Sequence, residues 1–487
     1  MFGLKKKGEE FITSLKKRLL LEVFNLLLGT EKGRETLLKK VEKQIEELIL
    51  KKEKSGIPYI RKVKYSFIVS LIKGSLRNIE RGYFSKRYAR RVIDIMVKNL
   101  FLKMECGKRK EEFEERFGFY PPSFVTISPT QRCNLRCRGC YAASSGKTFA
   151  SLPYNIVERI IKEMYEIAGS RFVVISGGEP FIWKDEGKGI LDIADEFNDV
   201  FFLVYTNSLL IGEEEARRME DLGNITPAIS VEGYEEETDR RRGKGVFKRI
   251  REKMELLKRV GVPFGVSVTA TRENINLLLD ERFYEYWFEE VGSTYMWMFH
   301  LMPIGRARNC MHLMITPEER KELFLLVERL LFEREYFIGD FWNSGAASDG
   351  CIAYGRSGGY FYIDWNGNIM PCVFVPYYKD NIYDLYRNGK TVIDALMSDY
   401  FKRGREWQLS YGFLKEKPRS FLSPCSIRDH HEYFRKNILT DDIKPEDENA
   451  KEALEDPEYF KLLKEFDEKL WSLTDPLWEE RLKHGKN

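Results

Sequence analysis

Histidine, cysteine and proline are scarce in this chain of 487 residues, which contains 5 His, 8 Cys and 17 Pro. So few histidines argue against a metal centre built from several imidazoles. Eight cysteines in a chain of this length exclude a small disulfide-stapled scaffold. The low proline content and the 43% of hydrophobic residues exclude a disordered or collagen-like chain. The length allows about two to four domains of roughly 100–200 residues each.

Long apolar runs are also absent. A transmembrane helix needs roughly 18 or more consecutive apolar residues. The two most apolar stretches near the N-terminus, residues 11–28 and 59–76, are interrupted by Glu22, Asn25 and several lysines. No small-residue cleavage site follows a clean apolar region, so we expect no signal peptide. The sequence therefore predicts a cytoplasmic protein without a membrane-spanning segment.

Acidic residues are few at the N-terminus. Residues 1–110 contain 29 Lys and Arg against 12 Asp and Glu, whereas the other 377 residues contain 51 against 64. Apolar residues at helical spacing make the stretches 11–28 and 59–76 basic and amphipathic. Such helices either dock on an anionic membrane surface or cap the main domain, and the sequence leaves both alternatives open. The first would place the protein peripherally on the inner membrane surface.

From Ser123 onward, short β-rich segments alternate with amphipathic helical segments, which is typical of βα units. We expect strands over 124–128, 172–176, 200–205, 226–231, 264–270 and 295–302. We expect helices over 154–168, 213–222, 246–260 and 318–332. Six repeats fit an α/β fold with a partial (β/α)6 barrel, in which ligands bind at the carboxyl ends of the strands.

Three cysteines follow the first expected strand, in the sequence SPTQRCNLRCRGCYAAS. Cys133, Cys137 and Cys140 have the spacing CxxxCxxC, and three thiolates on one loop form a soft metal site. A cubane iron–sulfur cluster held by three cysteines leaves one iron open for a substrate or cofactor. A structural zinc site would need a fourth ligand, and no histidine lies nearby in the sequence. The spacing therefore favours an iron–sulfur cluster.

This motif resembles that of the radical S-adenosylmethionine (SAM) superfamily, in which CxxxCxxC follows the first strand of a partial (β/α)6 barrel. Many members have an aromatic residue directly before the last cysteine, whereas here Gly139 precedes Cys140 and Tyr141 follows it. The resemblance covers about residues 123–305. It implies a 4Fe-4S cluster whose open iron binds the methionine part of SAM, and reductive cleavage of SAM to a 5′-deoxyadenosyl radical. It also implies an electron donor such as ferredoxin or flavodoxin.

The loops after the next strands resemble the SAM-binding motifs of the same superfamily. The second expected strand ends in SGGEP, where glycine lets the backbone approach the methionine ammonium and a carboxylate accepts from this cation. The third ends in a TN loop, and a serine near the end of the fourth strand together with an arginine in a DxxRG segment would bind the SAM carboxylate. The SAM-binding residues implied by the resemblance are Ser176, Gly177, Gly178, Glu179, Pro180, Asn207, Ser230 and Arg242. Only the DxxR spacing favours Arg242 over Arg240 and Arg241, and no catalytic acid or base is predicted.

A second group of cysteines lies beyond residue 335. Cys351 and Cys372 flank an expected hairpin with Asn366-Gly367 as its turn, and Cys425 follows later. This arrangement resembles the SPASM or twitch extensions of radical SAM enzymes, which bind auxiliary clusters. Full SPASM domains contain more cysteines, so the resemblance implies at most one auxiliary iron–sulfur cluster here. Three buried structural cysteines are the alternative. The fourth ligand is left open among Cys310, Asp429, His430, His431 and a substrate.

The sequence thus predicts four parts. They are a basic helical N-terminal unit (1–118), a radical SAM partial barrel (119–335), a small cysteine-containing SPASM/twitch-like extension (336–435) and a charged helical tail (436–487).

The substrate has no motif of its own. We expect the enzyme to abstract hydrogen from an unactivated C–H bond. The substrate that we expect first is a membrane lipid chain, which would undergo C–C coupling or a similar modification. The basic N-terminus supports this expectation, as does a pocket lined by the run 295–299, although that run also fits barrel core. The whole arrangement weakly resembles membrane-spanning and tetraether lipid synthases. The alternatives are a peptide-modifying SPASM-type maturase and a non-catalytic iron–sulfur electron-transfer or nucleic-acid-binding protein. The SGGEP loop argues against the last, and no nucleic-acid partner is favoured.

Overall fold

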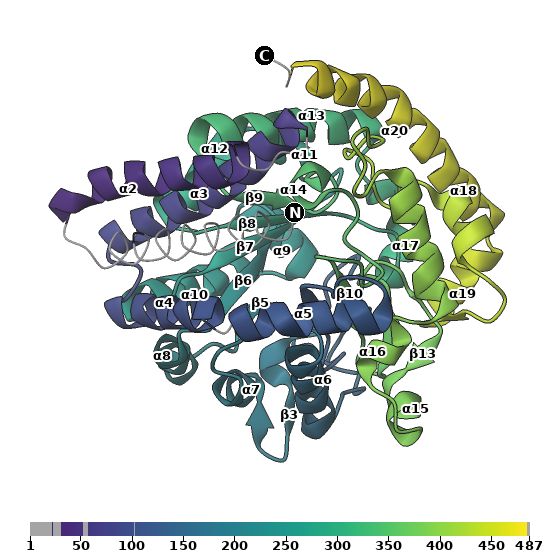
Figure 1. Ribbon diagram of the computed structural model, residues 1–487, viewed down its shortest axis with the longest axis horizontal. Helices are drawn as coiled ribbons and strands as arrows, with labels where there is room; N and C mark the ends of the chain where they lie inside the picture. The colour runs from purple at the N-terminus through teal and green to yellow at the C-terminus, as the bar shows by residue number, and fades with distance from the viewer. Residues whose placement is uncertain (1–21, 23–30, 52–56, 102, 485–487) are drawn as a thin grey trace, which may run out of the picture.

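A computed structural model describes residues 22, 31–51, 57–101 and 103–484 (Figure 1). Among these residues, a ten-stranded sheet runs through the molecule in the order β13-β11-β10-β1-β2-β5-β6-β7-β8-β9. Neighbouring strands from β10 to β9 pair in parallel, and β11 and β13 pair antiparallel. Helices cover the outer face of this sheet (Figure 1).

The six expected barrel strands are all present. They are β1 (Phe124–Ile127), β2 (Phe172–Ile175), β5 (Phe201–Thr206), β6 (Ile225–Val231), β7 (Gly265–Ala270) and β8 (Met296–His300). In β1, Val125 and Ile127 are fully buried under the helices, whereas Phe124 and Thr126 face the barrel interior. This alternation has the period of a strand. The predicted α/β partial barrel is confirmed.

Helices join the strands around the outside of the barrel. They are α6 (Tyr154–Glu166), α7 (Ile190–Glu196), α8 (Glu213–Leu222), α9 (Glu235–Arg242), α10 (Val246–Val260), α11 (Ile275–Leu278), α12 (Glu281–Glu285) and α13 (Pro317–Arg329). Local sequence fixes several of their ends. A capping box of Thr316 and Glu319 starts α13, and Gly223 and Gly261 end α8 and α10 with φ of 65° and 91°.

The C-terminal extension adds strands at both edges of the barrel. β9 (Ile338–Asp340) pairs with β8, whereas β10 (Tyr360–Ile363) lies beside β1. β11 (Asn368–Met370) turns back on β10 through the expected Asn366-Gly367 turn, with Gly367 at φ 79°. The remaining elements are α14 (Gly345–Ser348), β12 (Tyr377–Tyr378), β13 (Asp380–Asn381), α15 (Ile382–Arg387), α16 (Val392–Ala395), α17 (Asp399–Tyr411), α18 (His431–Tyr433), β14 (Lys444–Pro445), α19 (Glu448–Glu455) and α20 (Pro457–His484).

The N-terminal helices are α2 (Glu31–Glu46), α3 (Pro58–Glu80), α4 (Lys86–Phe101) and α5 (Lys103–Phe117). The stretch 59–76 therefore forms a helix, and α3 packs on the barrel. Lys73 pairs with Glu335, and both Arg77 and Arg81 pair with Glu289, each at 2.7 Å. For this stretch the structure shows a helical cap, while the stretch 11–28 lies, except for Glu22, outside the described residues.

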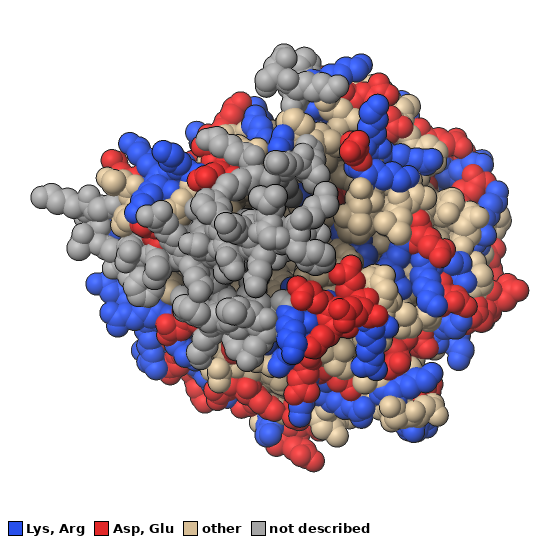
Figure 2. Space-filling model, in the orientation of Figure 1, with Lys and Arg blue, Asp and Glu red and all other residues tan. Residues whose placement is uncertain are grey.

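Charges of both signs are intermixed over the described part of the face seen in Figure 2. Within the residues that the structure describes, no helix combines the length and the apolar character needed to cross a membrane. Docking on a membrane surface stays a prediction.

Candidate functional site

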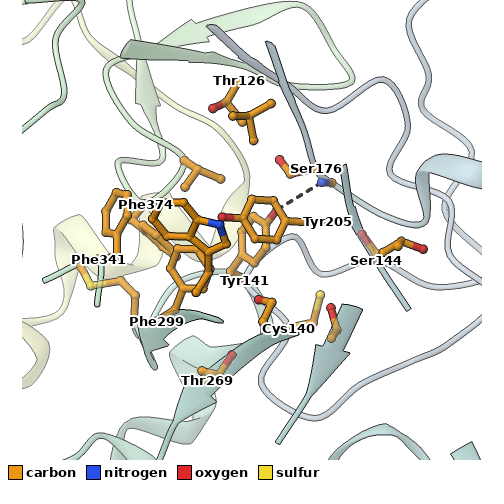
Figure 3. A pocket seen from close by; sticks show the side chains of 18 of the residues that line it. Thr126, Cys140, Tyr141, Ser144, Ser176, Tyr205, Thr269, Phe299, Phe341 and Phe374 are labelled. Carbon is orange, nitrogen blue, oxygen red and sulfur yellow. Dashed lines mark hydrogen bonds between the residues drawn. The ribbon is translucent and has the colours of Figure 1, made fainter. Parts of the chain in front are cut away.

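A cavity of about 330 Å³ lies at the carboxyl ends of the barrel strands and extends into the barrel (Figure 3). Cys133, Cys137 and Cys140 line it from the loop after β1. The loops after β2 and β5, the end of β6 and the end of α9 contribute most of the predicted SAM-binding residues, in line with the rule that ligands bind at the carboxyl ends of the strands. These are Ser176, Gly177, Gly178, Asn207, Ser230 and Arg242. Glu179 and Pro180 do not line the cavity.

Several donors surround the sulfur atoms of the first cysteine group. Leu135 N lies 3.5 Å and Asn207 Nδ2 3.8 Å from Cys133 Sγ, and Arg242 Nη1 lies 3.9 Å from Cys137 Sγ. Burial raises the pKa of Cys133 to about 12, because a thiolate loses its hydration there. Hydrogen bonds and positive charge at sulfur are what a thiolate-bound iron–sulfur cluster needs, so this donor set fits such a group.

Among the described residues, metal-ligating side chains do not converge on a single ion. In the described part of the chain, no group of three or more His, Cys, Asp or Glu residues is arranged to hold one metal ion. A cubane cluster does not require its ligands to converge on one ion, because each of its cysteines binds a separate iron. Three thiols spread around one cavity wall suit the cluster better than a mononuclear ion.

The two glycines of SGGEP pack against the cysteine loop. Gly178 N donates to Thr130 O at 2.9 Å, and a Cβ on Gly178 would lie 2.2 Å from Arg132 O. Gly177 has φ 103°, and its N–H donates to the Tyr141 hydroxyl at 3.2 Å. Glycine is needed here because the two loops approach each other at backbone distance.

The Glu179 carboxylate is fully buried and already has protein donors. Its oxygens accept from Thr206 Oγ1 at 2.7 Å, Asn207 N at 2.8 Å and Phe181 N at 3.2 Å. Burial raises the pKa of Glu179 to about 7, although these hydrogen bonds act in the opposite direction. In the structure this side chain links SGGEP to the end of β5 and the loop after it, through its hydrogen bonds with Thr206 and Asn207. Its contact with the methionine ammonium stays a prediction.

The three adjacent arginines have different surroundings. Arg240 pairs with Glu236 and does not line the cavity, whereas Arg241 and Arg242 do. Both bind the buried carboxylate of Glu232, Arg241 at 2.6 Å and Arg242 at 2.5 Å. The sequence interpretation missed Glu232. Its position directly after β6, where ligands bind in this kind of barrel, was the available signal.

The deep part of the cavity is apolar and aromatic. Trp297 and Phe299 of β8 line it, whereas Met296 and Met298 are fully buried on the opposite face of this strand. The run 295–299 therefore contributes both to the cavity wall and to the core. Tyr141, Tyr205, Phe299, Phe341 and Phe374 surround the cavity in Figure 3.

The second group of cysteines shares a cavity of about 210 Å³, which Cys351, Cys372 and Cys425 all line. Trp297 and Phe341 line both cavities, so the two adjoin. Two groups lie close to the Cys372 sulfur: the Tyr360 hydroxyl at 2.9 Å and Phe374 N at 3.4 Å.

None of the sequence candidates for a fourth ligand lines this second cavity. Asp429 binds the Arg320 guanidinium with both oxygens, at 2.5 and 3.1 Å. The rings of His430 and His431 bind the carbonyls of Ser423 and Ile427. Cys310 packs in a separate apolar cluster with Leu301 and Leu463.

Residues 127–277 match the family model described as the radical SAM superfamily. This segment is a radical SAM domain. The radical SAM superfamily uses a 4Fe-4S cluster and SAM, and its enzymes need a reductant such as flavodoxin or ferredoxin.

Curated relatives match part of the chain. The sporulation killing factor maturation protein SkfB of Bacillus subtilis is 28% identical over 162 residues, which are 33% of this chain and 39% of SkfB. The AdoMet-dependent heme synthase of Methanosarcina barkeri is 28% identical over 194 residues, 38% of this chain and 52% of the synthase. The chain thus spans about half or less of the length of these two relatives.

Among solved structures, Streptococcus suis SuiB bound to precursor peptide SuiA superposes with a TM-score of 0.51. The identity is 16%, over 72% of this chain and 81% of SuiB. At this identity the likeness supports the radical SAM fold alone.

Proposed function

We propose that this chain is a radical SAM enzyme whose Cys133, Cys137 and Cys140 hold the 4Fe-4S cluster. Ser176–Gly178, Asn207, Ser230 and Arg242 would bind SAM beside the cluster. The observation that carries this proposal is the convergence of these residues, from four separate strand ends, on one cavity wall. When bound, the cluster and SAM supply a 5′-deoxyadenosyl radical that abstracts hydrogen from an unactivated C–H bond.

The protein's own residues organise the polar end of this site. Arg242 is held by Glu232, which fixes its guanidinium beside the Cys137 sulfur and leaves it facing the cavity. A carboxylate bound there would meet a buried cation and the Ser230 hydroxyl. The aromatic wall at the other end excludes water, which protects reactive species from side reactions.

We also propose that Cys351, Cys372 and Cys425 hold one auxiliary iron–sulfur cluster. Their shared cavity supports this proposal, and so does its position directly behind the aromatic wall. An electron leaving a substrate in the first cavity would have to pass only the side chains that separate the two cavities.

The apolar wall supports a substrate whose reacting group is apolar. A peptide side chain is the first candidate, supported by the likeness of one third of this chain to SkfB, a maturation protein. A lipid chain is the second, supported by the wall alone. Nothing among the relatives favours lipid modification. Two of the cations that suggested membrane docking, Lys64 and Lys73, pair with Asp349 and Glu335. A non-catalytic role is not proposed.

The test is anaerobic reconstitution with iron and sulfide, reduction, and quantification of 5′-deoxyadenosine formed from SAM. Wild type should form it, and Cys137→Ala should form background amounts only. Cys137→Ala and Cys372→Ala should each lose about half of the iron, because each removes a ligand of a different cluster. Cys310→Ala is the matched control and should retain both activity and iron. A wild type with full iron content that forms no 5′-deoxyadenosine would overturn the proposal.

A further inference from the structure

Arg306 binds the backbone of the cysteine loop from the other side of the barrel, in the segment that follows β8. Its three guanidinium nitrogens donate to three different carbonyl oxygens of the loop: Nε to Cys137 O at 3.3 Å, Nη1 to Ala143 O at 2.7 Å and Nη2 to Ser144 O at 2.6 Å. Its backbone N–H donates to a fourth carbonyl, Cys140 O, at 3.0 Å. One residue thus binds the loop from its second cysteine to the residues that follow its third.

The loop needs such support because part of its backbone is strained. Ala143 has φ 50°, in the left-handed region that a residue with a side chain rarely adopts. A conformation of this kind persists only when the surrounding structure imposes it. The Ala143 carbonyl accepts from Arg306, and the Ala143 N–H donates to Cys140 O at 3.2 Å. Arg306 therefore stabilises the bend that follows the third cysteine.

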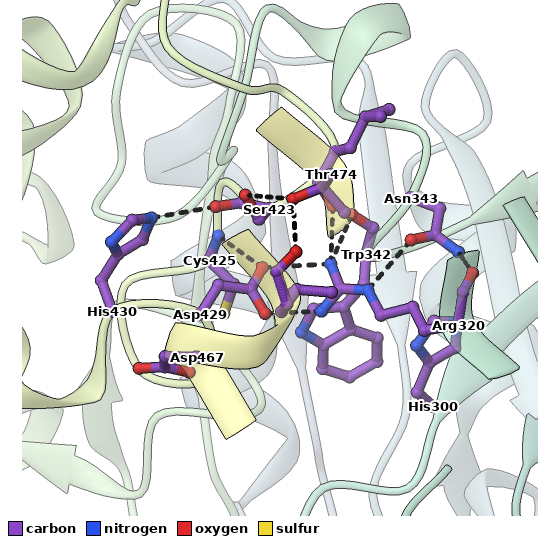
Figure 4. A network of polar contacts seen from close by, with 12 residues as sticks. His300, Arg320, Trp342, Asn343, Ser423, Cys425, Asp429, His430, Asp467 and Thr474 are labelled. Carbon is purple, nitrogen blue, oxygen red and sulfur yellow. Dashed lines mark hydrogen bonds and ion pairs between the residues drawn. The ribbon is translucent and has the colours of Figure 1, made fainter. Parts of the chain in front are cut away.

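The positive charge of Arg306 is not balanced by an acidic side chain. In the described part of the chain, the bonds of its guanidinium go to carbonyl oxygens and to no Asp or Glu. Arg320 also binds two carbonyls, those of Trp342 and Leu422, but there Asp429 balances the charge (Figure 4). Three thiolates bring negative charge to the cysteine loop, and a nearby cation stabilises them. Arg306 therefore supplies both hydrogen bonds and positive charge to this loop.

The segment that carries Arg306 is itself anchored to the C-terminal helix. The next residue, Ala307, packs in an apolar cluster that includes Leu463 of α20. Arg308 pairs with Asp456, which directly precedes α20. The donors of Arg306 thus start from a fixed position, whereas the loop that they bind consists of turns and irregular backbone. The loop therefore takes its shape from this segment.

We infer that Arg306 is a positioning residue of the radical SAM site, which holds residues 137–144 in the shape that presents the three thiols to one cluster. Without these bonds the loop should adopt other shapes, and the first cluster should be lost more easily. The second cysteine group should be unaffected, because the bonds of Arg306 go to the first loop alone. This inference rests on the proposed function, because it assigns a role within that same site.

Arg306→Met tests the inference, since it keeps the length of the side chain and removes its donors and its charge. The variant is combined with Cys372→Ala, so that only the first cluster holds iron, and iron release to a chelator is followed after anaerobic reconstitution. Arg306→Met should release iron at least about tenfold faster, which corresponds to about 1.4 kcal/mol, close to the value of one hydrogen bond to a charged group. Arg306→Lys keeps the charge and fewer donors, so its rate should lie in between.

Two controls separate loop positioning from a general loss of stability. Arg308→Met removes a neighbouring cation that binds Asp456 instead of the loop, and it should release iron at the rate of the Cys372→Ala protein. In Cys137→Ala, where only the second cluster holds iron, Arg306→Met should leave the release rate unchanged. A general loss of stability would accelerate release from both clusters.

An unchanged rate for the first cluster, or equal acceleration for both clusters, would overturn the inference. If Arg306→Met fails to fold, Arg306→Lys decides in the same two backgrounds, and failure of both variants to fold would overturn it as well. A Cys372→Ala protein that has Arg306 and binds no iron would overturn the proposed first cluster, and the inference with it.

Discussion

At the scale of single residues, the site depends on close approaches between loops. Gly178 lies where the SGGEP loop meets the backbone of the cysteine loop. The neighbouring Gly177 donates its N–H to the hydroxyl of Tyr141. The loops that carry the thiols and the SAM-binding residues therefore position each other. A change in one of them should disturb the other.

Gly178→Ala should weaken the protein and its cluster site together. The added Cβ would lie 2.2 Å from a backbone oxygen, which cannot rotate away, so the loops must separate. We expect a loss of about 1–3 kcal/mol in the free energy of unfolding, as for other overpacked sites, and reduced iron uptake. Urea unfolding and iron analysis measure the two effects. Gly146→Ala, whose Cβ would lie 3.8 Å from the nearest atom, is the control. Normal stability of Gly178→Ala would contradict the expectation.

At the scale of elements, α3 is built into the barrel through polar contacts in a buried interface. Asn78 Nδ2 donates to Gly292 O at 2.8 Å and to Thr294 Oγ1 at 2.9 Å. A Cβ on Gly74 would lie 2.9 Å from Thr294 O, so the helix backbone is already close to the barrel there. The helix is therefore seated in one position.

Asn78→Ala should detach α3 partly from the barrel. Removing the amide leaves two buried acceptors without their donor, which costs about 1–3 kcal/mol. Thermal unfolding measures the loss, and hydrogen exchange of 58–80 should increase. Ser75→Ala removes a hydroxyl that bonds only within α3 and should change stability by less than about 0.5 kcal/mol. If the two variants were equally stable, the Asn78 contacts would not hold the helix.

The repeating elements were predictable because their signals are local. The six strands and the four helices α6, α8, α10 and α13 show in the spacing of apolar residues, and the Asn366-Gly367 turn shows in a dipeptide. The shorter helices α7, α9, α11 and α12 were not predicted. β9 was not predicted, since Ile338–Asp340 has no periodicity and is a strand only through its pairing with β8. Glu232 and Arg306 were missed for a similar reason: the groups that they bind, Arg242 and the carbonyls of residues 137–144, lie on other elements.

At the scale of the whole molecule, α20 covers a group of buried polar residues around His431 and contributes Asp467 to it. It runs along the outer edge of the molecule, at the upper right of Figure 1, and its Asp467 Oδ2 accepts from His431 N at 2.6 Å. The other oxygen of Asp467 is buried without a hydrogen bond among the described residues. Burial raises the pKa of Asp467 to about 9, and Asp429 acts in the same direction. Global stability should therefore respond to pH through this carboxyl group.

The sign of this response follows from the ordinary pKa of Asp, 3.8, in the unfolded chain. Because the folded pKa is higher, the stability that the protonated group provides is complete below pH 4 and is lost as pH rises towards 9. Asp467→Asn removes this dependence, so its stability relative to wild type should rise by about 4 kcal/mol between pH 5 and pH 8, three pH units at about 1.4 kcal/mol each. Urea unfolding at pH 5 and pH 8 measures the difference, which should widen with pH. A difference that stays the same at the two pH values would contradict this expectation.

The position of β10 beside β1 has a consequence for synthesis on the ribosome. β1 is finished at Ile127, but the strand that covers its free edge begins only at Tyr360, roughly 230 residues later. At about 5–20 residues per second, that edge waits roughly 10–50 s for its partner. During this interval the nascent chain presents an unpaired strand next to the cysteine loop, and such edges invite pairing with other chains. Nascent chains stalled before Tyr360 should therefore depend on chaperones more strongly than chains released beyond Met370.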